Sequence, residues 1–511
     1  MCLSLRNYPR QERRWTPPQA LPPAFPRSTT AARSRIFSMP SGKTVLLWWT
    51  VEREGRPWRS SGVSICPVEP EKTSIFRLLR RRAKMSEPLA ILGGPKAVTI
   101  QGVERWKRPI ERELALIKTL LEEGNLSGEG SGFPKQFEDT FREFIGAPYC
   151  LLTDHGTTAL ASAYYAVGVG PGDEVITPVA GFICSFAGAL HLGARPVFAD
   201  VDPETLLVDP QEVERKITPR TRAINIVHLG GNLCDMDAFL DIGKRYGIPI
   251  VEDAAHAAGA EWDGKKIGSF GDITCFSMQG VNPNGKPIAG GEGGMVTTGN
   301  REFYERQLIY CHLHRAGIVS ELTLPPYRMF DEQVLGLKFR AHPLALAVAM
   351  ASFETLPYRI EKSNEYREAL FQALREIPGL APEKSYPKAK RISLYGGLKI
   401  RYQAEALDGL PIEKFIAAVR AEGVPISDPG WKHAGSTQQL QHLKPLFARG
   451  FDLWGRNRGP LGNDYCPPRK GDFPNAEHAD ASFFTLPSLI DPEEGLLEQW
   501  VTAFQKVVSH R

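Results

Sequence analysis

A glycine-rich segment around one lysine, GVNPNGKPIAGGEGG at residues 280–294, carries the strongest chemical signal in the chain. From Gly280 it reads G-x-x-x-x-G-K-P, one position away from the nucleotide-binding pattern that ends in G-K-[ST]. Pro287 lacks the hydroxyl that such a loop offers to Mg²⁺, and the glycines after it do not suit a phosphate-binding helix. The alternative is a lysine that forms a Schiff base with an aldehyde cofactor, because a tight glycine loop allows close approach. We therefore expect Lys286 to make a covalent bond.

The segment DHGTTAL, residues 154–160, predicts a site for an anion. It follows a predicted strand and opens a predicted helix, so the backbone N–H groups of Thr157 and Thr158 should point outward at the helix N-terminus. Gly156 lets the chain turn there, and the two hydroxyls add donors for a phosphate. A helix cap without a ligand is the alternative, and this segment alone does not exclude it.

Two more residues stand after predicted strands, where ligands gather in an open α/β sheet. Asp253 ends the apolar run IPIVED, and its carboxylate serves either as a structural cap or to keep a cofactor nitrogen protonated. Phe182 is either core or a flat surface for an aromatic cofactor ring. A lysine for an aldehyde, an acid for a ring nitrogen, an aromatic face and a phosphate cradle are together what pyridoxal 5'-phosphate requires.

Alternating strand-like and helix-like segments should position these residues. Strands separated by helices of this length predict βαβ units and a mainly parallel sheet covered on both faces. The expected strands lie at residues 149–154, 173–179, 195–201, 222–229, 248–254, 273–278 and 293–299. The expected helices lie at residues 111–124, 135–146, 156–168, 185–193 and 236–247.

The sequence divides into three parts. Residues 1–84 form a basic leader rich in proline and arginine, which we expect to be disordered or outside the native protein, with translation starting at Met85. A transit peptide and a functional arm are the alternatives. Residues 85–354 should form the large cofactor-binding domain, and residues 355–511 a smaller C-terminal α+β domain.

The charge distribution argues against nucleic acid as a partner. The leader holds 17 of the 62 Lys and Arg residues but 5 of the 58 Asp and Glu residues, so the remaining chain carries a net charge of −8. No apolar run is long enough for a membrane span. The eight cysteines form no C-x-x-C pair, which is typical of reduced thiols in a cytoplasmic protein, and we expect no metal site.

The body of the chain resembles the DegT/DnrJ/StrS family of pyridoxal-phosphate-dependent aminotransferases, which act on keto sugars and keto cyclitols. The likeness covers most of residues 88–505, and its segments include GTTALASAYYAVGVGPGDEVITP, GARPVFADVDPET, VEDAAHAAGA, GSFGDITCFSMQ and GEGGMVTT. It implies the type I fold of these enzymes, with active sites shared across a homodimer.

The resemblance also implies a role for each site residue. Lys286 falls on the Schiff-base lysine, Asp253 on the acid at the pyridine nitrogen, and His256 on the contact to the ring hydroxyl. Phe182 falls on the stacking aromatic. The phosphate ligands implied are Ser277, Thr157 and Thr158.

The sequence departs from the family pattern at two places that concern the site. Four extra residues lie between Ser277 and Lys286, which alters the expected path of that loop. Lys338 stands where many members have an asparagine, and we expect it to reach the phosphate bound by the neighbouring subunit.

These residues predict an aminotransferase that moves an amino group from glutamate or glutamine to a keto sugar or keto cyclitol. Lys286 should act as general base and acid, and ping-pong kinetics should follow. The alternatives are a dehydratase or other lyase using the same cofactor, and a cofactor-binding regulator without turnover. Some relatives that dehydrate sugars have histidine at the lysine position, so Lys286 favours transamination.

Overall fold

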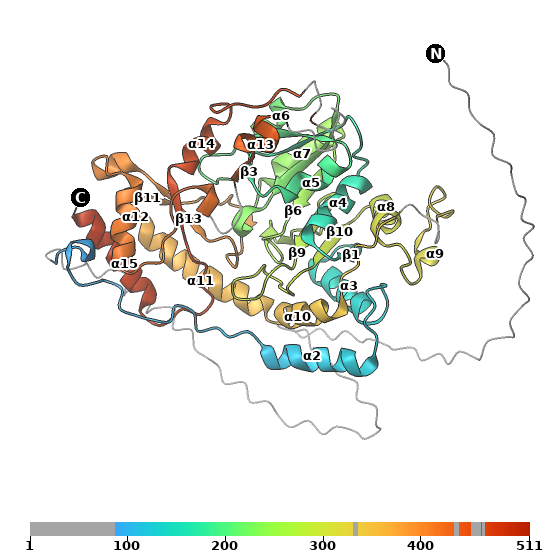
Figure 1. The fold of residues 1–511 in the computed structure, drawn as a ribbon, viewed down its shortest axis with the longest axis horizontal. Helices are drawn as coiled ribbons and strands as arrows, with labels where there is room; N and C mark the ends of the chain where they lie inside the picture. The colour runs from blue at the N-terminus through green and yellow to red at the C-terminus, as the bar shows by residue number, and fades with distance from the viewer. Residues whose placement is uncertain (1–86, 331–335, 434–438, 451–460, 462–464, 511) are drawn as a thin grey trace, which may run out of the picture. The chain divides into compact units, whose positions relative to one another are not determined.

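Seven strands form the central sheet of the structure, which is a computed structural model (Figure 1). It describes residues 87–510, except 331–335, 434–438, 451–460 and 462–464. The strand order is β1-β10-β9-β6-β5-β2-β4, and only β10 runs against the other six strands. The strands are β1 (Tyr149–Thr153), β2 (Glu174–Pro178), β4 (Arg195–Ala199), β5 (Thr221–Val227), β6 (Ile250–Asp253), β9 (Ile273–Ser277) and β10 (Gly294–Thr298). The predicted mainly parallel sheet is confirmed.

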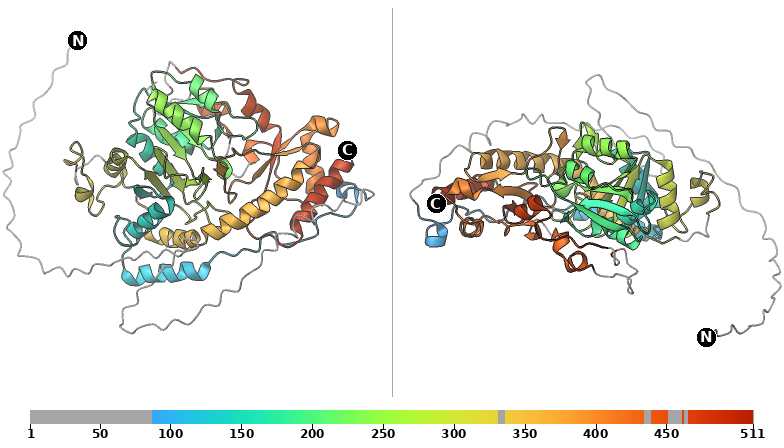
Figure 2. Two further views of the ribbon diagram at one scale, coloured as in Figure 1. Left: turned by 180° about the vertical axis from the view of Figure 1, so that it is seen from behind. Right: turned by 90° about the horizontal axis from the view of Figure 1, so that it is seen from above.

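Successive residues of these strands enter two different cores, because side chains alternate across a sheet. On β6, Ile250 joins a core with Phe239 of α7, whereas Val251 joins a core with Leu160 of α4. Helices therefore cover both faces (Figure 2). The helices of this part are α2 (Ile110–Glu123), α3 (Gly132–Ile145), α4 (Gly156–Ala166), α5 (Cys184–His191), α6 (Pro210–Arg215), α7 (Met236–Tyr246), α8 (Arg301–Cys311), α9 (Ile318–Glu321) and α10 (Pro343–Glu354).

A second, three-stranded antiparallel sheet with the order β11-β13-β15 has its own hydrophobic core. The long helix α11 extends from the first core toward this sheet, with α15 packed beside α11 and α12 packed beside α15 (Figure 1). These elements are β11 (Leu380–Pro382), β13 (Leu398–Tyr402), β15 (Phe483–Leu486), α11 (Leu356–Arg375), α12 (Ile412–Ala421) and α15 (Leu496–Ser509). The smaller α+β region is thus present, and the boundary after residue 354, between α10 and α11, stays a prediction.

Several short elements were not predicted from the sequence. Gln439 and Leu440 pair with Gly181 and Ala180, which brings a C-terminal segment against the chain before α5. The short elements are β3 (Ala180–Gly181), β7 (Glu261–Trp262), β8 (Lys265–Lys266), β12 (Ala389–Lys390), β14 (Gln439–Leu440), α13 (Pro445–Ala448) and α14 (Pro474–Asp480). The predicted leader lies outside the described residues. No helix in the described part is long and apolar enough to cross a membrane.

Candidate active site

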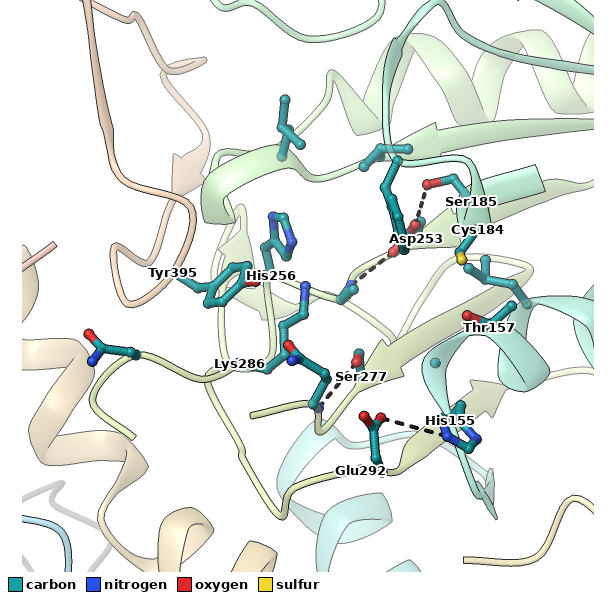
Figure 3. Close-up of a pocket in the computed structure, with 18 residues that line it drawn as sticks. His155, Thr157, Cys184, Ser185, Asp253, His256, Ser277, Lys286, Glu292 and Tyr395 are labelled. Carbon is teal, nitrogen blue, oxygen red and sulfur yellow. Dashed lines mark hydrogen bonds and ion pairs between the residues drawn. The ribbon is translucent and has the colours of Figure 1, made fainter. Parts of the chain in front are cut away.

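A cavity of about 460 Å³ opens at the carboxyl ends of the parallel strands. This is the edge of an open α/β sheet at which ligands are expected. Figure 3 shows the cavity with Lys286 near its centre. Six of the eight predicted site residues line it: Thr157, Phe182, Asp253, His256, Ser277 and Lys286.

Lys286 lies in the loop that joins β9 to the antiparallel β10. Gly280 and Gly291 close this loop through two backbone hydrogen bonds of 2.8 and 2.9 Å. Inside it, the backbone N–H of Lys286 donates to the carbonyl of Gln279 at 2.9 Å, and its carbonyl accepts from the side chain of Asn282. The chain runs from Lys286 into strand β10 without an intervening helix. The loop is therefore not a phosphate-binding loop of the nucleotide type, in which a helix follows the lysine.

Two side chains from α10 and α11 hold the lysine loop from behind. The Arg359 guanidinium donates to the carbonyl of Pro287 at 2.7 Å, and the Ser352 hydroxyl accepts from the backbone N–H of Ala289. Arg359 and Ser352 are both buried, and Ser352 also donates to Asn282. Hydrogen bonds to buried side chains therefore fix the loop on one side, while Lys286 lines the cavity on the other.

The Lys286 amine is placed to be partly neutral. Burial lowers its pKa to about 8, because desolvation outweighs the opposing attraction of Asp253 and Cys184. Its Nζ atom lies 4.1 Å from the centroid of the Tyr395 ring. A neutral amine is the form that attacks an aldehyde, so this lysine is suited to nucleophilic chemistry.

Asp253 is buried at the end of β6 with its carboxylate oriented from two sides. The Ser185 hydroxyl donates to Oδ2 at 2.7 Å, and the backbone N–H of Ala255 donates to Oδ1 at 3.1 Å. The two donors fix the orientation of the carboxylate. Figure 3 shows this carboxylate and Ser185 together on the side of the cavity opposite Tyr395.

His256 lies beside Tyr395, with the two ring centroids 4.7 Å apart. Its Nδ1 accepts the backbone N–H of Gly230 at 3.0 Å, so in the neutral ring the proton resides on Nε2. Burial holds the pKa of His256 well below its usual range, and the nearby Lys286 and Lys399 add to this effect. The ring is therefore a neutral donor at physiological pH.

The first turn of α4 forms the other side of the cavity. A side chain at Gly156 would meet Cβ of Ser277 at 2.8 Å, so only glycine allows this close approach. The backbone N–H groups at the start of a helix have no intrahelical acceptor, and Thr157 and Ser277 both line the cavity. The geometry fits a phosphate group at the N-terminus of α4.

Thr158 and Lys338 are not among the lining residues. The Thr158 hydroxyl accepts the backbone N–H of His155 at 3.2 Å, which completes a helix cap, and it donates to Asp154 at 2.6 Å. Lys338 is exposed and its backbone forms an isolated bridge with His312.

Sequence reasoning missed several lining residues. Tyr395 comes from the segment before β13, and nothing in its local sequence marks it as a site residue. Ser185 lies in α5 within the helix that the sequence predicts, and its hydroxyl also orients Asp253, a role that the helical pattern does not indicate. His155 also lines the cavity, and its Nε2 lies 3.8 Å from the Glu292 carboxylate.

The chain matches the model of the DegT/DnrJ/EryC1/StrS aminotransferase family over residues 108–429. The chain belongs to this family. The expected membership is therefore confirmed, and with it the assignment as an aminotransferase. Among the described residues no cluster of His, Cys, Asp and Glu could hold a metal ion.

The relatives of this DegT/DnrJ/EryC1/StrS aminotransferase include several with cyclitol substrates in their names. An L-glutamine:2-deoxy-scyllo-inosose aminotransferase of Micromonospora echinospora is 30% identical and covers 83% of this chain and 98% of its own. The L-glutamine:scyllo-inosose aminotransferase of Streptomyces griseus is 34% identical over 66% of this chain and 80% of its own. The crystal structure of 3-amino-5-hydroxybenzoic acid synthase is 27% identical, with a TM-score of 0.64 over 80% of this chain and 98% of that chain.

Proposed function

We propose that this enzyme transfers the amino group of L-glutamine to the keto carbon of a cyclitol, with pyridoxal 5'-phosphate as cofactor. The names of two relatives with the same donor and acceptor class support this choice over glutamate and over a nucleotide sugar. A dehydratase is not favoured, because these relatives are aminotransferases and the family is one of aminotransferases.

The observation that carries the proposal is the meeting of Lys286, Asp253 and His256 in one cavity. Bound pyridoxal phosphate supplies an aldehyde and an electron-withdrawing ring. Its phosphate would lie at Thr157 and Ser277, its ring beside Phe182, its nitrogen at Asp253 and its hydroxyl at His256. The close contact of Gly156 with Ser277, the oriented carboxylate and the partly neutral amine fit this group.

Lys286 performs the proton transfer. Its Nζ atom takes the proton from the α-carbon of the amino donor and returns a proton at the former keto carbon of the acceptor. A pKa of about 8 lets the amine serve in both directions near neutral pH, because neither protonation state is rare. Tyr395 and the clamped loop keep the amine in reach of both carbons.

Asp253 and His256 keep the ring in its reactive state. The Asp253 carboxylate, oriented by Ser185 and Ala255, would stabilise a proton on the ring nitrogen. The Nε2 proton of His256 is available for the ring hydroxyl, since Gly230 occupies Nδ1.

A homodimer belongs to the same proposal. Lys338 is exposed and does not line the cavity of its own chain, which leaves its amine free to reach the phosphate site of a second subunit. We expect the protein in solution to have the mass of a dimer. We also expect the Lys338→Ala variant to bind the cofactor more weakly. A monomer with full activity would contradict this part.

The two half-reactions test the proposed function separately. Mixing the cofactor-loaded enzyme with L-glutamine should convert the cofactor to its amine form, which is followed by absorbance. Adding scyllo-inosose should then restore the starting spectrum and yield an amino cyclitol, identified by mass spectrometry. Absence of the first change with L-glutamine refutes the donor, and absence of the second with keto cyclitols refutes the acceptor.

A further inference from the structure

A second cavity, of about 610 Å³, lies beside the one that holds Lys286. Asn284 and Tyr395 line both cavities, so these two side chains stand where the cavities adjoin. The remaining lining comes from the lysine loop, the segment before β13, residues 425–427 after α12, and the end of β15. Most of this wall belongs to the smaller α+β region.

The lining of the second cavity is uncharged. No lysine, arginine, histidine, aspartate or glutamate is among the described residues that line it. Prolines, leucines and one isoleucine alternate with polar groups that carry no charge. The polar side chains are Asn284, Ser427, Thr485 and Ser488. A diphosphate bound here would lose its hydration without gaining a cationic partner. A polyhydroxylated ring could pack its C–H groups against the apolar residues and form hydrogen bonds with the polar side chains.

The Ser488 hydroxyl is suited to a ligand. Its Oγ atom is buried and has no hydrogen-bond partner among the described residues. The neighbouring Ser427 hydroxyl differs, because it donates to the carbonyl of Asp428 and accepts the backbone N–H of Thr485. Buried hydroxyls are normally hydrogen-bonded, so Ser488 would be satisfied by a hydroxyl group of a bound molecule.

We infer that the second cavity is the acceptor subsite and takes an uncharged, polyhydroxylated ring in preference to a nucleoside diphosphate. The inference rests on the proposed function, since the keto carbon must reach Lys286 Nζ beside the Tyr395 ring. The part of the acceptor beyond that carbon then extends past Tyr395 and Asn284. Glutamine reacts at its α-carbon, which meets Lys286 Nζ in the first cavity.

The substitution Ser488→Phe fills the second cavity and separates the two substrates. We expect the scyllo-inosose concentration for half-maximal rate to rise at least about tenfold, because pocket contacts to the acceptor are lost. The L-glutamine half-reaction should stay within about twofold. Ser320→Phe, at an exposed serine on α9, is the matched control and should change neither half-reaction. Ser488→Ala keeps the cavity open and should weaken the acceptor by roughly threefold to tenfold through one lost hydrogen bond.

An unchanged acceptor half-reaction in both Ser488 variants overturns the inference, as does an equal loss in both half-reactions. Equally efficient use of guanosine diphosphate 4-keto-6-deoxymannose and scyllo-inosose by the unmodified enzyme overturns it as well. If the unmodified enzyme does not react with L-glutamine, that result contradicts the proposed function and not the acceptor subsite. In that case, calorimetry of scyllo-inosose binding to the pyridoxamine-phosphate-loaded protein, with and without Ser488→Phe, still decides whether the cavity binds the ring.

Discussion

The Nζ atom of Lys286 lies 4.1 Å from the centre of the Tyr395 ring. Lys286 lies in the loop between β9 and β10 of the central sheet, and Tyr395 lies in the segment that leads into β13 of the second sheet. An aromatic face attracts the charged form of an amine. The contact therefore opposes the burial that lowers the pKa of Lys286 to about 8.

Replacing Tyr395 by leucine should remove this attraction while keeping the cavity dry. We expect the apparent pKa of Lys286 to fall below 8 and kcat/KM to drop roughly threefold to thirtyfold. Tyr395→Phe keeps the ring and should retain most of the activity. The pH dependence of cofactor capture measures the pKa, and a pKa that rises in Tyr395→Leu would contradict the role of the ring.

Lys286 should be the attachment point of the cofactor. Borohydride reduction of the enzyme loaded with pyridoxal phosphate should leave the added mass on the peptide that contains Lys286. Lys286→Ala should carry no such mass and should lose at least about 10³-fold in activity, because nucleophile and base are both removed. Lys362→Ala, at a lysine on α11, is the control. Labelling of Lys286→Ala at the same level would rule out the assignment.

The capture of pyridoxal phosphate by the cofactor-free protein should depend on pH. The folded pKa of Lys286, about 8, lies below the ordinary lysine value, so the reactive neutral amine appears as the pH rises through 8. Between pH 7 and pH 9 the neutral fraction increases about tenfold. Stopped-flow absorbance should show the same rise in the second-order rate constant. A midpoint near the ordinary lysine value would mean that burial does not activate the amine.

The substitution Ser185→Ala should weaken cofactor binding, because it removes a hydrogen bond that orients Asp253. The carboxylate would lose its 2.7 Å hydrogen bond and keep the one from Ala255. Binding of pyridoxamine phosphate, which makes no covalent bond to Lys286, should weaken about tenfold. Ser162→Ala is the matched control, because this buried serine on α4 bonds to the carbonyl of Ala159 and does not line the cavity. Equal affinity of the two variants would argue against an orienting role for Ser185.

Breaking the buried ion pair between Arg315 and Glu138 should strongly lower the free energy of unfolding. Arg315 donates to Glu138 through two nitrogens at 3.0 and 2.7 Å, and both side chains are almost fully buried. Arg315→Met leaves the carboxylate buried without its partner and should cost about 3–5 kcal/mol in the free energy of unfolding. Arg105→Met breaks an exposed pair with Asp491 and should cost at most about 1 kcal/mol. Urea denaturation compares the two, and similar losses would contradict the expectation.

Local sequence was sufficient for the residues at strand ends. An apolar run that stops at Asp253, and a glycine turn that opens a helix at Thr157, both signal their positions within a few residues. The alternation of strands and helices then implied that these ends meet at one edge of the sheet. The structure bears out the sheet and brings six predicted residues to one cavity.

Residues that reach the site through tertiary packing could not be predicted in this way. Tyr395 and Ser488 lie near strands of the second sheet, and their local sequences resemble ordinary turns. Ser185 sits within a helix, and its bond to Asp253 depends on how α5 packs against β6. Such contacts arise from the arrangement of whole elements, and no short pattern encodes them.

The hairpin geometry of the lysine loop bears on how such enzymes diversify. Because β9 and β10 are adjacent and antiparallel, the bonds between Gly280 and Gly291 close the loop whatever its length beyond them. The free-energy cost of closing a loop grows slowly with its length, so insertions between these two glycines leave the sheet intact. The same insertion moves Asn284 at the border of both cavities. Evolution can therefore retune which acceptor is taken by changing loop length, with the catalytic lysine and its supporting strands held constant.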